Sequence, residues 1–476
     1  MSSILWFRND LRLHDNETLH SALKMAKPVL MVYIIDPRQF EVNALKFRKT
    51  GRLRFRFLME TLSSLRNACL QKGGNLMIKV GIPEVILPEL IDEFDVNHLF
   101  YQKEITSEEV AIEAALSERL TALPCEITAV WGLTLYHVDD APFSPQDTPL
   151  TSKAFRLNLT KKAEVRPCFD TPSELPPFPA VKDWGKLPEV SDVGLEHESG
   201  LTENSSFVGG EEHALARLDH YTFKTEQLTA YRWTRNRSLG MDYSSKFSPW
   251  MALGSLSPRK IYWQIKDYES RIKKNASTWW LVFELVWRDY FKFLAMRFGN
   301  LIFSEGGYRQ RKVEWKTDKK LFDRWCQGQT GIPFVDAHMR ELNQTGFMSN
   351  RGRVNCASFL TRDYQIDWRW GAAWFEKQLL DYDVCSNWLN WNTQATEIWY
   401  TNAIHQGYKY DKKGDYVRFW LPELRLVPGP EIQAPWILSS EEKLAYEVVN
   451  YPLPETIFSK WTRSINTIDK ERMEKG

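Results

Sequence analysis

The sequence predicts an α/β domain with a doubly wound parallel sheet over residues 1–136, a connector over 137–210 and an all-helical domain over 211–476. Three observations support this division. Short apolar runs alternate with longer helical patterns in the first part, which is typical of a parallel sheet covered by helices. Pro, Ser, Asp and Glu are frequent in the second part. Helical periodicity continues almost throughout the third part.

Five runs in the first domain have the composition of strands. They are ILWF, PVLMVYII, NLMIKV, NHLFYQ and EITAVW, which begin at residues 4, 28, 75, 97 and 126. Helical patterns occupy residues 51–71 and 107–123, and the second opens with Ser107 followed by acidic residues, as helix N-termini often do. Because no G-x-G-x-x-G pattern follows the first strand, the usual dinucleotide fingerprint is absent from this domain.

The third part carries its strongest helical patterns at residues 248–268, 278–298 and 336–346. Two Ser-Pro pairs, which begin at Ser248 and Ser257, each indicate a helix start. In both, we expect the serine as the N-cap and the proline at the first helical position, where its missing N–H costs nothing.

The composition limits the classes of protein to consider. The chain has 43% hydrophobic and 26% charged residues, and no apolar run approaches the roughly 20 residues that span a bilayer. Its amino terminus enters an apolar run at once, which leaves no room for a signal segment, so we expect a cytoplasmic protein with no membrane partner. The net charge of +1 means that any nucleic-acid binding requires a local basic face. The cysteines are far apart and lack finger spacing, so neither disulfides nor a metal site is predicted.

The chain contains 20 tryptophans, most of them in its second half. A large helical core accounts for most of these residues, because indoles bury much apolar area. The run LLDYDVCSNWLNWN at residues 379–392 is different, since it combines aspartates, asparagines and tryptophans. It has no His pair, Cys pair or Gly-rich turn beside it. Its chemistry has to be inferred from the surrounding motifs.

Three other stretches gather polar groups. DYSSKFSPW at residues 242–250 brings hydroxyls, a lysine and backbone N–H groups together, which suits a diphosphate or, alternatively, a polar turn that caps a helix. FELVWRDYF places Glu284 and Arg288 one helical turn apart among aromatic residues. Such a pair is usually a surface ion pair worth about 0.2–0.5 kcal/mol, but a partly buried carboxylate could hydrogen-bond a heterocycle. MSNRGRVN at residues 348–355 is, alone, a basic loop.

Together with WFRNDLRLHDNETL at residues 6–19 and GDYVRFWLPEL at residues 414–424, these stretches resemble the photolyase and cryptochrome family along almost the whole chain. RNDLRLHDNE, DYSSKFSPW and DYDVCSNW are most similar to the cryptochrome-DASH branch. The resemblance implies a flavodoxin-like antenna domain and a C-terminal helical domain that binds FAD. It also implies methenyltetrahydrofolate as an antenna chromophore, although the connector that would match this site is only partly similar to the family.

The resemblance assigns roles to individual residues. Positions that bind FAD in the family match Tyr231, Ser244, Ser245, Lys246, Phe247, Ser248, Asn350, Arg353, Asp381, Asp383 and Asn387. Trp391 matches the tryptophan nearest the flavin, and Trp368 and Trp315 match the middle and surface members of an electron-transfer chain. Trp388 is an alternative to Trp391, since both lie in the same short run. Indoles can give an electron to an excited flavin, so successive indoles could carry the hole to solvent.

The resemblance also implies a substrate. Positions that line the hole for a flipped-out pyrimidine dimer match Glu284, Trp287, Arg288 and Asn350, and Arg351 in the adjacent basic loop would contact DNA. Trp287 could stack on the lesion, a contact worth about 1–3 kcal/mol per base. Extrusion of a damaged base pair costs least where pairing is already lost. We therefore expect single-stranded or loosened DNA as the substrate of a monomeric enzyme.

The reaction follows from the loop that matches NRGRV. Relatives that repair (6-4) lesions carry histidines there, whereas this chain has Asn350 and Val354. Splitting a cyclobutane dimer requires only an electron that is delivered and returned. We therefore predict a cyclobutane-dimer photolyase in which Glu284, Asn387 and the three tryptophans of the chain are catalytic.

The chain departs from the DASH pattern after DYDVCSNW. Thr393 replaces the aromatic residue expected beside the lesion, and residues 393–407 form a shorter segment without glycine before Gly407. Two alternatives therefore stay open. One is a blue-light photoreceptor that signals through its flavin redox state. The other is a nucleic-acid-binding relative that has lost its flavin.

Overall fold

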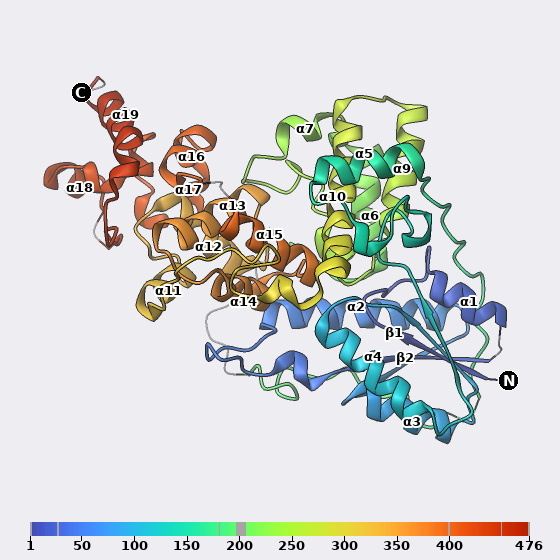
Figure 1. The fold of residues 1–476 in the computed structure, drawn as a ribbon. Coiled ribbons are helices and arrows are strands. Elements are labelled where there is room, and N and C mark those ends of the chain that lie inside the picture. Colours follow the sequence, from blue (N-terminus) through green and yellow to red (C-terminus); the bar gives the residue numbers. More distant parts are fainter. Residues whose placement is uncertain are drawn as a thin grey trace.

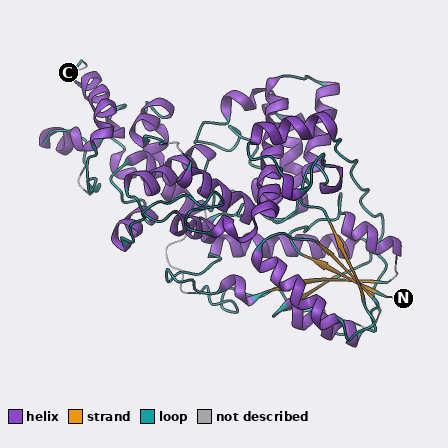
Figure 2. Cartoon of the chain, viewed as in Figure 1, coloured by secondary structure: helices purple, strands orange, loops and turns teal. Residues whose placement is uncertain are grey.

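The computed structural model describes residues 2–25, 28–179, 181–196, 206–397, 400–448 and 450–474. The amino-terminal residues form an α/β layer, and a group of helices packs above it in the view of Figure 1. The chain ends in further helices at the end of the molecule opposite the sheet (Figure 1). All strands of the sheet come from the amino-terminal part, and the rest of the described chain is helices and loops (Figure 2). The predicted fold class is confirmed.

The sheet has five parallel strands in the order β3-β2-β1-β4-β5. Their bounds are β1 Ser3–Phe7, β2 Val29–Ile35, β3 Leu76–Val80, β4 His98–Gln102 and β5 Glu126–Val130, so all five predicted strands are present. Leu5 pairs with Met31 on one side and with Phe100 on the other. Every residue of β1 and β2 is buried, as expected for central strands that are covered on both faces.

Helices cover both faces of the sheet. They are α1 Glu17–Met25, α2 Arg52–Gln71, α3 Pro83–Glu93 and α4 Ser107–Leu120. Leu5 and Phe7 pack with α1 and α2, whereas Ile4 and Trp6 pack with α3 and α4, because successive side chains of a strand point to opposite faces. The helix predicted at residues 107–123 ends earlier, and its N-cap is Thr106. Ser107 is instead its first helical residue.

The described residues of the connector include one α-helix, α5 Ser152–Lys162, which packs against α10. Thr151 caps α5, since its Oγ1 accepts a hydrogen bond from the Ala154 N–H at 3.3 Å. Phe155 and Leu159 of α5 belong to the same buried cluster as the residues of α10. The connector therefore contributes to the helical core as well as joining the two parts. The boundaries 1–136 and 211–476 stay predictions.

The third part is helical. Its helices are α6 Glu211–Asp219, α7 Tyr231–Thr234, α8 Ser248–Ala252, α9 Pro258–Arg271, α10 Ala276–Phe298, α11 Lys319–Cys326, α12 Pro333–Thr345, α13 Asn350–Ser358, α14 Trp368–Gln378, α15 Val384–Thr396, α16 Ala403–Tyr410, α17 Asp415–Trp420, α18 Ser440–Ala445 and α19 Thr462–Met473. Among the described residues, none of these helices combines the length and apolarity that crossing a bilayer requires.

One of the two predicted serine caps is confirmed. The Ser257 Oγ accepts hydrogen bonds from the Arg259 and Lys260 N–H groups at 3.1 and 3.4 Å. The prediction for Ser248 is wrong: Ser248 is the first helical residue of α8, and Phe247 occupies the cap position without a side-chain hydrogen bond. Ser248 instead lines a cavity, described below.

The RNDLRLHDNE segment joins the sheet to the helical part. The buried Asp15 carboxylate forms an ion pair with Arg259 Nη2 at 2.8 Å and accepts a hydrogen bond from the Ser257 hydroxyl. Gly254 has φ +72°, and a Cβ there would lie 2.0 Å from the Asn9 carbonyl oxygen. This close approach requires glycine. The motif thus serves as a docking surface between the two parts.

We expect Asp15→Ala to lower the free energy of unfolding by about 3 kcal/mol, because it leaves the buried Arg259 guanidinium with only the longer ion pair to Glu17 at 3.5 Å. Urea denaturation would measure the change. Asp267→Ala is the matched control, since it removes an exposed pair with Arg271 that should be worth less than about 1 kcal/mol. Equal effects of the two substitutions would contradict the prediction.

Candidate functional site

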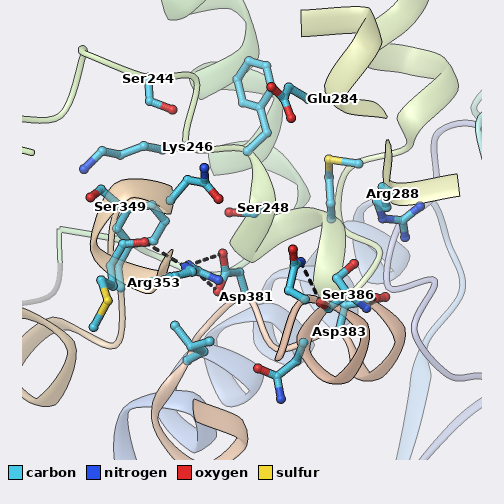
Figure 3. Close-up of a pocket in the computed structure, with 18 of the residues that line it drawn as sticks. Ser244, Lys246, Ser248, Glu284, Arg288, Ser349, Arg353, Asp381, Asp383 and Ser386 are labelled. Atoms are coloured by element: carbon cyan, nitrogen blue, oxygen red, sulfur yellow. Dashed lines mark hydrogen bonds and ion pairs between the residues drawn. The ribbon is translucent and has the colours of Figure 1, made fainter. Parts of the chain in front are cut away.

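A cavity of about 450 Å³ lies among α8, α10, α13, α15 and the turn that precedes α8 (Figure 3). This volume is within the range of about 300–1,000 Å³ that is typical of ligand sites. All eleven residues predicted to bind a cofactor line it: Tyr231, Ser244, Ser245, Lys246, Phe247, Ser248, Asn350, Arg353, Asp381, Asp383 and Asn387. Glu284, Arg288 and Trp391 line it as well. Residues scattered over 160 positions of sequence thus meet in one cavity.

Arg217 of α6 fixes the backbone of the turn before α8 by hydrogen bonds. Arg217 donates to the carbonyl oxygens of Met241, Ser244 and Ser245 at 3.0–3.1 Å and forms an ion pair with Asp242 at 2.6 Å. Several bonds from one planar guanidinium fix the backbone of the turn. The hydroxyls of this turn are therefore presented to the cavity by a clamped backbone and not by a free loop.

Lys246 has an unusual environment in this turn. Its φ is +54°, in the left-handed region that non-glycine residues seldom adopt. Its Nζ lies 4.5 and 4.6 Å from the ring centroids of Tyr243 and Phe347. Burial lowers the pKa of Lys246, and Glu341 partly opposes this effect. The ammonium is thus held by ring faces and is available to an anionic ligand.

Two carboxylates on the opposite side of the cavity have cationic partners. Asp381 accepts hydrogen bonds from Arg353 Nη2 at 2.7 and 2.9 Å, and Figure 3 shows this pair facing the cavity. Asp383 forms an ion pair with Lys292 of α10 at 2.6 Å. The Asp383 side chain also caps α15, because its Oδ1 accepts from the Ser386 N–H at 2.8 Å.

The Asp383 carboxyl is strongly ionised. Burial alone raises its pKa, but the positive charges of Lys292 and Arg288, together with hydrogen bonds from Lys292 and the Ser386 N–H, outweigh burial and hold the pKa well below its usual range. For Lys292, burial lowers the pKa and Asp383 more than compensates, so the pKa is raised. Both members of the pair are therefore charged across the physiological pH range.

Glu284 and Arg288 do not pair with each other. Glu284 binds the guanidinium of Arg235 and accepts a hydrogen bond from Trp280 Nε1 at 3.0 Å. Burial raises the pKa of Glu284, while Arg235 opposes this shift. Arg288 donates to the Leu133 carbonyl oxygen at 2.5 Å. The usual i, i+4 ion pair is thus replaced by contacts to other segments, and both side chains border the cavity (Figure 3).

Asn387 and Trp391 follow Asp383 on α15. Asn387 Nδ2 donates to the Ala372 carbonyl oxygen at 3.0 Å, which orients the amide at the cavity wall. Trp391 packs on α14, where a Cβ at Gly371 would lie 2.2 Å from Trp391 Cη2. Glycine is therefore required for this close approach of helix to indole.

The three tryptophans proposed for electron transfer belong to one hydrophobic cluster. Trp391 and Trp368 are buried members, and the half-buried Trp315 packs against it. A backbone bridge between Lys316 and Ile366 brings the segments of Trp315 and Trp368 side by side. Of the three, only Trp391 lines the cavity.

Trp388, the alternative to Trp391, is not among the residues that line the cavity. Its ring instead lies 5.7 Å from that of Trp368 and 5.0 Å from that of Phe303. Its Nε1 donates to the Tyr382 hydroxyl at 3.2 Å. The arrangement therefore favours Trp391 as the indole nearest a bound ligand.

Two residues predicted to contact DNA lie outside the cavity lining. Trp287 is half-buried, and its ring centroid lies 6.1 Å from that of Phe283 and 5.7 Å from that of Phe291. Arg351 donates to Asn236 Oδ1 at 2.9 Å and to Gln406 Oε1 at 3.2 Å. Their roles stay predictions.

The segment that departs from the expected pattern is partly helical. Helix α15 continues to Thr396, and Thr393 and Gln394 line the cavity from its last turns. Helix α16 begins at Ala403, so both ends of the segment 393–407, which its polar composition suggested to be a loop, are helical. Residues 398 and 399 lie outside the described part of the chain.

Comparison with known proteins identifies the family. A family model described as the FAD binding domain of DNA photolyase matches residues 280–469, and one described as DNA photolyase matches residues 3–180. A cryptochrome DASH from Synechocystis sp. is 46% identical over 464 residues, which cover 95% of this chain and 94% of the relative. This chain belongs to the photolyase and cryptochrome family, in the cryptochrome-DASH branch.

Solved structures of the photolyase and cryptochrome family agree with this assignment. The crystal structure of a Synechocystis sp. cryptochrome matches with a TM-score of 0.93 and 44% identity and covers 98% of each chain. A class III photolyase from Agrobacterium tumefaciens matches with a TM-score of 0.83 and 28% identity, again over 98% of each chain.

The cavity residues fit the FAD of the photolyase and cryptochrome family. The turn before α8 offers hydroxyls and a lysine to a diphosphate, whereas Asp381, Asp383 and Asn387 offer hydrogen-bonding groups to a heterocycle. Apolar side chains such as Leu281 and Phe375 line the remaining wall. Both kinds of surface are needed by a ligand with a charged centre and a flat aromatic ring.

Sequence reasoning missed three residues that organise this site. Arg217 clamps the turn, Arg235 neutralises Glu284, and Lys292 fixes Asp383. Each lies outside the short polar stretches that draw attention in the sequence. Lys292 was recognisable in principle, since a lysine inside the apolar face of the helix at residues 278–298 requires a buried partner.

We expect Lys292→Met to raise the pKa of Asp383, because the largest favourable charge is removed while burial remains. A lowered folded-state pKa keeps a carboxylate ionised until the pH falls through that value. The wild-type protein should therefore retain its flavin equally from pH 5 to 8, whereas the variant should lose flavin progressively as the pH falls.

The flavin-to-protein absorbance ratio after gel filtration at several pH values would measure this. Lys319→Met, which changes an exposed lysine paired with Asp323, is the matched control. A variant at Lys292 whose flavin content equals that of the control at every pH would refute the role of the pair.

Proposed function

We propose that this chain is a blue-light-dependent, FAD-containing lyase that splits cyclobutane pyrimidine dimers in single-stranded or locally unpaired DNA. The observation that carries the proposal is the meeting of Asp381, Asp383, Asn387 and Trp391 in one cavity that is also bordered by Glu284 and Arg288. Reduced flavin, when bound and excited, supplies one electron to the dimer and takes it back, so two carbon–carbon bonds break without net oxidation.

The residues of the cavity have separate roles in this proposal. Lys246 and the neighbouring serines hold the diphosphate, and Arg353 with Asp381 orients the heterocycle. Asn387 is fixed by its bond to the Ala372 carbonyl oxygen and would hydrogen-bond the heterocycle with the rest of its amide. Glu284, Arg288 and Asn350 receive the flipped-out dimer, with Trp287 and Arg351 at its margin. No histidine is needed, because no hydroxyl group is transferred.

The three tryptophans restore the reduced flavin. We propose that Trp391 would be the electron donor nearest a bound flavin and that Trp368 and Trp315 would be the further indoles of the route. The packing of all three rings in one cluster supports their assignment as a set. Trp315 is half-buried and is followed by the exposed Lys316, so the hole would end near solvent.

The proposal also includes the pairing state of the DNA substrate and an antenna chromophore. Unpaired DNA is favoured because extrusion of a base costs a few kcal/mol, and least where pairing is lost. We also propose that the protein acts as a cytoplasmic monomer and that methenyltetrahydrofolate binds the α/β domain as an antenna. A folate band in the absorption spectrum of the purified protein would test the antenna.

Blue light should restore intact pyrimidines in a single-stranded oligonucleotide that contains one cyclobutane dimer when photoreduced protein is present. Chromatography of the digested oligonucleotide would measure the yield. Glu284→Ala should lower the rate about tenfold or more, since a hydrogen bond to a charged group is worth about 1.5–3 kcal/mol. Glu441→Gln, at an exposed position of α18, is the control. An intact dimer after illumination of the wild-type protein would end the proposal.

Trp391→Phe should slow photoreduction of the bound flavin at least about tenfold while leaving flavin content unchanged, because phenylalanine keeps the ring packing against Phe375 but cannot give an electron. Absorbance under blue light with an external reductant would measure the rate. Trp388→Phe distinguishes the alternative assignment. If the change at Trp388 blocks photoreduction and that at Trp391 does not, the proposed order is incorrect.

A photoreceptor without repair activity is the second candidate function. Thr393 at the cavity wall favours it, because the aromatic contact expected beside a lesion is replaced by a small polar side chain. Pull-down of partner proteins in the dark and in light would support signalling if binding differs. Absence of flavin bands from the purified protein would instead favour a flavin-deficient nucleic-acid-binding relative.

A further inference from the structure

A row of aromatic rings lies along the amino-terminal half of α10, outside the cavity lining. Trp279, Phe283 and Trp287 are spaced four residues apart and therefore lie on one edge of the helix. The ring centroids of Trp279 and Phe283 are 5.4 Å apart with an interplanar angle of 22°, and those of Phe283 and Trp287 are 6.1 Å apart. Trp279 is 45% exposed, so the row ends at the surface.

A second pair of indoles lies beside this row. Trp280 contacts Trp279 with a centroid separation of 6.0 Å. Trp233 of α7 is 74% exposed, and α7 packs against α10 (Figure 1). We refer to Trp233, Trp279, Trp280, Phe283 and Trp287 as the aromatic shelf. Large exposed indoles in one area indicate a binding surface, because single exposed apolar residues are common but clusters are not.

Two arginines cover the shelf. Arg156 of α5 has its guanidinium carbon 5.2 Å from the ring centroid of Phe283 and 5.5 Å from that of Trp279. Arg232 lies 5.0 Å from Trp233 and 5.3 Å from Trp280. Within the described part of the chain, neither arginine is within ion-pair distance of a carboxylate. Positive charges without acidic partners thus lie directly over exposed rings.

The shelf residues are neighbours of residues that line the cavity. Tyr231 and Arg235, which line the cavity, flank Arg232 and Trp233 in sequence, and Glu284 lies beside Phe283 on α10. Trp280 Nε1 donates a hydrogen bond at 3.0 Å to Glu284, which lines the cavity. At a rise of 1.5 Å per residue, the eight residues from Trp279 to Trp287 span about 12 Å. A segment of about two nucleotides of an extended strand could lie along this length.

We propose that the aromatic shelf binds the nucleotides that flank the lesion in single-stranded DNA. The exposed ring of Trp279 stacks on a flanking base, and Arg156 and Arg232 contact the adjacent phosphates. This combination of stacking platform and cationic groups is sequence-tolerant and suits unpaired strands. Bases inside a duplex are already stacked and cannot cover the rings. The inference rests on the proposed function for its substrate and explains how the protein would select an unpaired strand.

Binding in the dark tests the shelf separately from repair. Fluorescence anisotropy would measure the affinity of the flavin-loaded protein for labelled oligothymidylates of about 4 and about 12 nucleotides, a range that spans known single-strand site sizes. Trp279→Ala should weaken binding of the longer strand, which can cover the whole shelf, by about five- to twentyfold. Trp279→Phe should restore most of the affinity.

Arg156→Gln provides a second, independent variant. Loss of one phosphate contact should lower the slope of log K against log salt by about 0.7 for the longer strand. Trp263→Ala is the matched control, because Trp263 is 41% exposed but lies on α9, away from the row on α10. A duplex of the same length should show no dependence on Trp279.

Two results would overturn the inference. One is unchanged binding of the longer strand by Trp279→Ala, which would leave the shelf to another kind of partner such as a protein. The other is equal losses at Trp263 and Trp279, which would indicate a general effect on the fold. Failure of the wild-type protein to repair a dimer would refute the proposed function but would not change this dark binding result.

Discussion

The buried ion pair between Lys292 and Asp383 is the interaction on which the arrangement of the site depends. Lys292 lies on α10 and Asp383 caps α15, so their contact at 2.6 Å fixes the two helices against each other where both line the cavity. Neither charge could be buried alone, because an isolated ion in a protein interior costs several kcal/mol. Each residue therefore determines where the other helix can lie.

Helix α10 extends this constraint to the rest of the molecule. Asp289 accepts hydrogen bonds from the Leu135 and Tyr136 N–H groups at 2.9 Å each, which attaches the chain just before the connector to the helix. Burial raises the pKa of Asp289 to about 7, and the two N–H groups oppose this shift. One side of α10 thus serves the cavity, another holds the connector, and its exposed edge carries the aromatic shelf. Helix α10 therefore carries cavity residues, contacts to the connector and the rings proposed to bind a DNA strand.

Preorganisation is the common feature of the charged groups around the cavity. Arg353 holds Asp381, Arg235 holds Glu284, and Arg217 holds the turn that contains Lys246. These side chains are already ordered without a ligand, so binding does not incur the entropic cost of ordering them. The resulting cavity is polar at specific points and apolar between them, as ligand sites usually are.

Much of this was predictable from the sequence, and the failures have identifiable physical causes. Short apolar runs located the five strands, because the central strands are buried on both faces, and period-3.6 patterns located the long helices. Motif similarity located the eleven cavity residues. The prediction for Ser248 was wrong because a Ser-Pro pair at a helix start can present its hydroxyl to a cavity instead of to the backbone. Glu284 and Arg288 lie one turn apart on α10, as expected, but each pairs with a group from another segment, which the sequence does not indicate.

The sequence by itself determined the family, the order of elements and the residue types available to a flavin, since these depend on local spacing and on ordered motifs. Only the tertiary structure decided which charges pair and which rings meet. Lys292 and Asp383 are 91 positions apart in sequence, and Arg156 reaches Trp279 from another helix. Such contacts depend on how helices pack, and local patterns contain no information about which distant side chain will satisfy a buried charge.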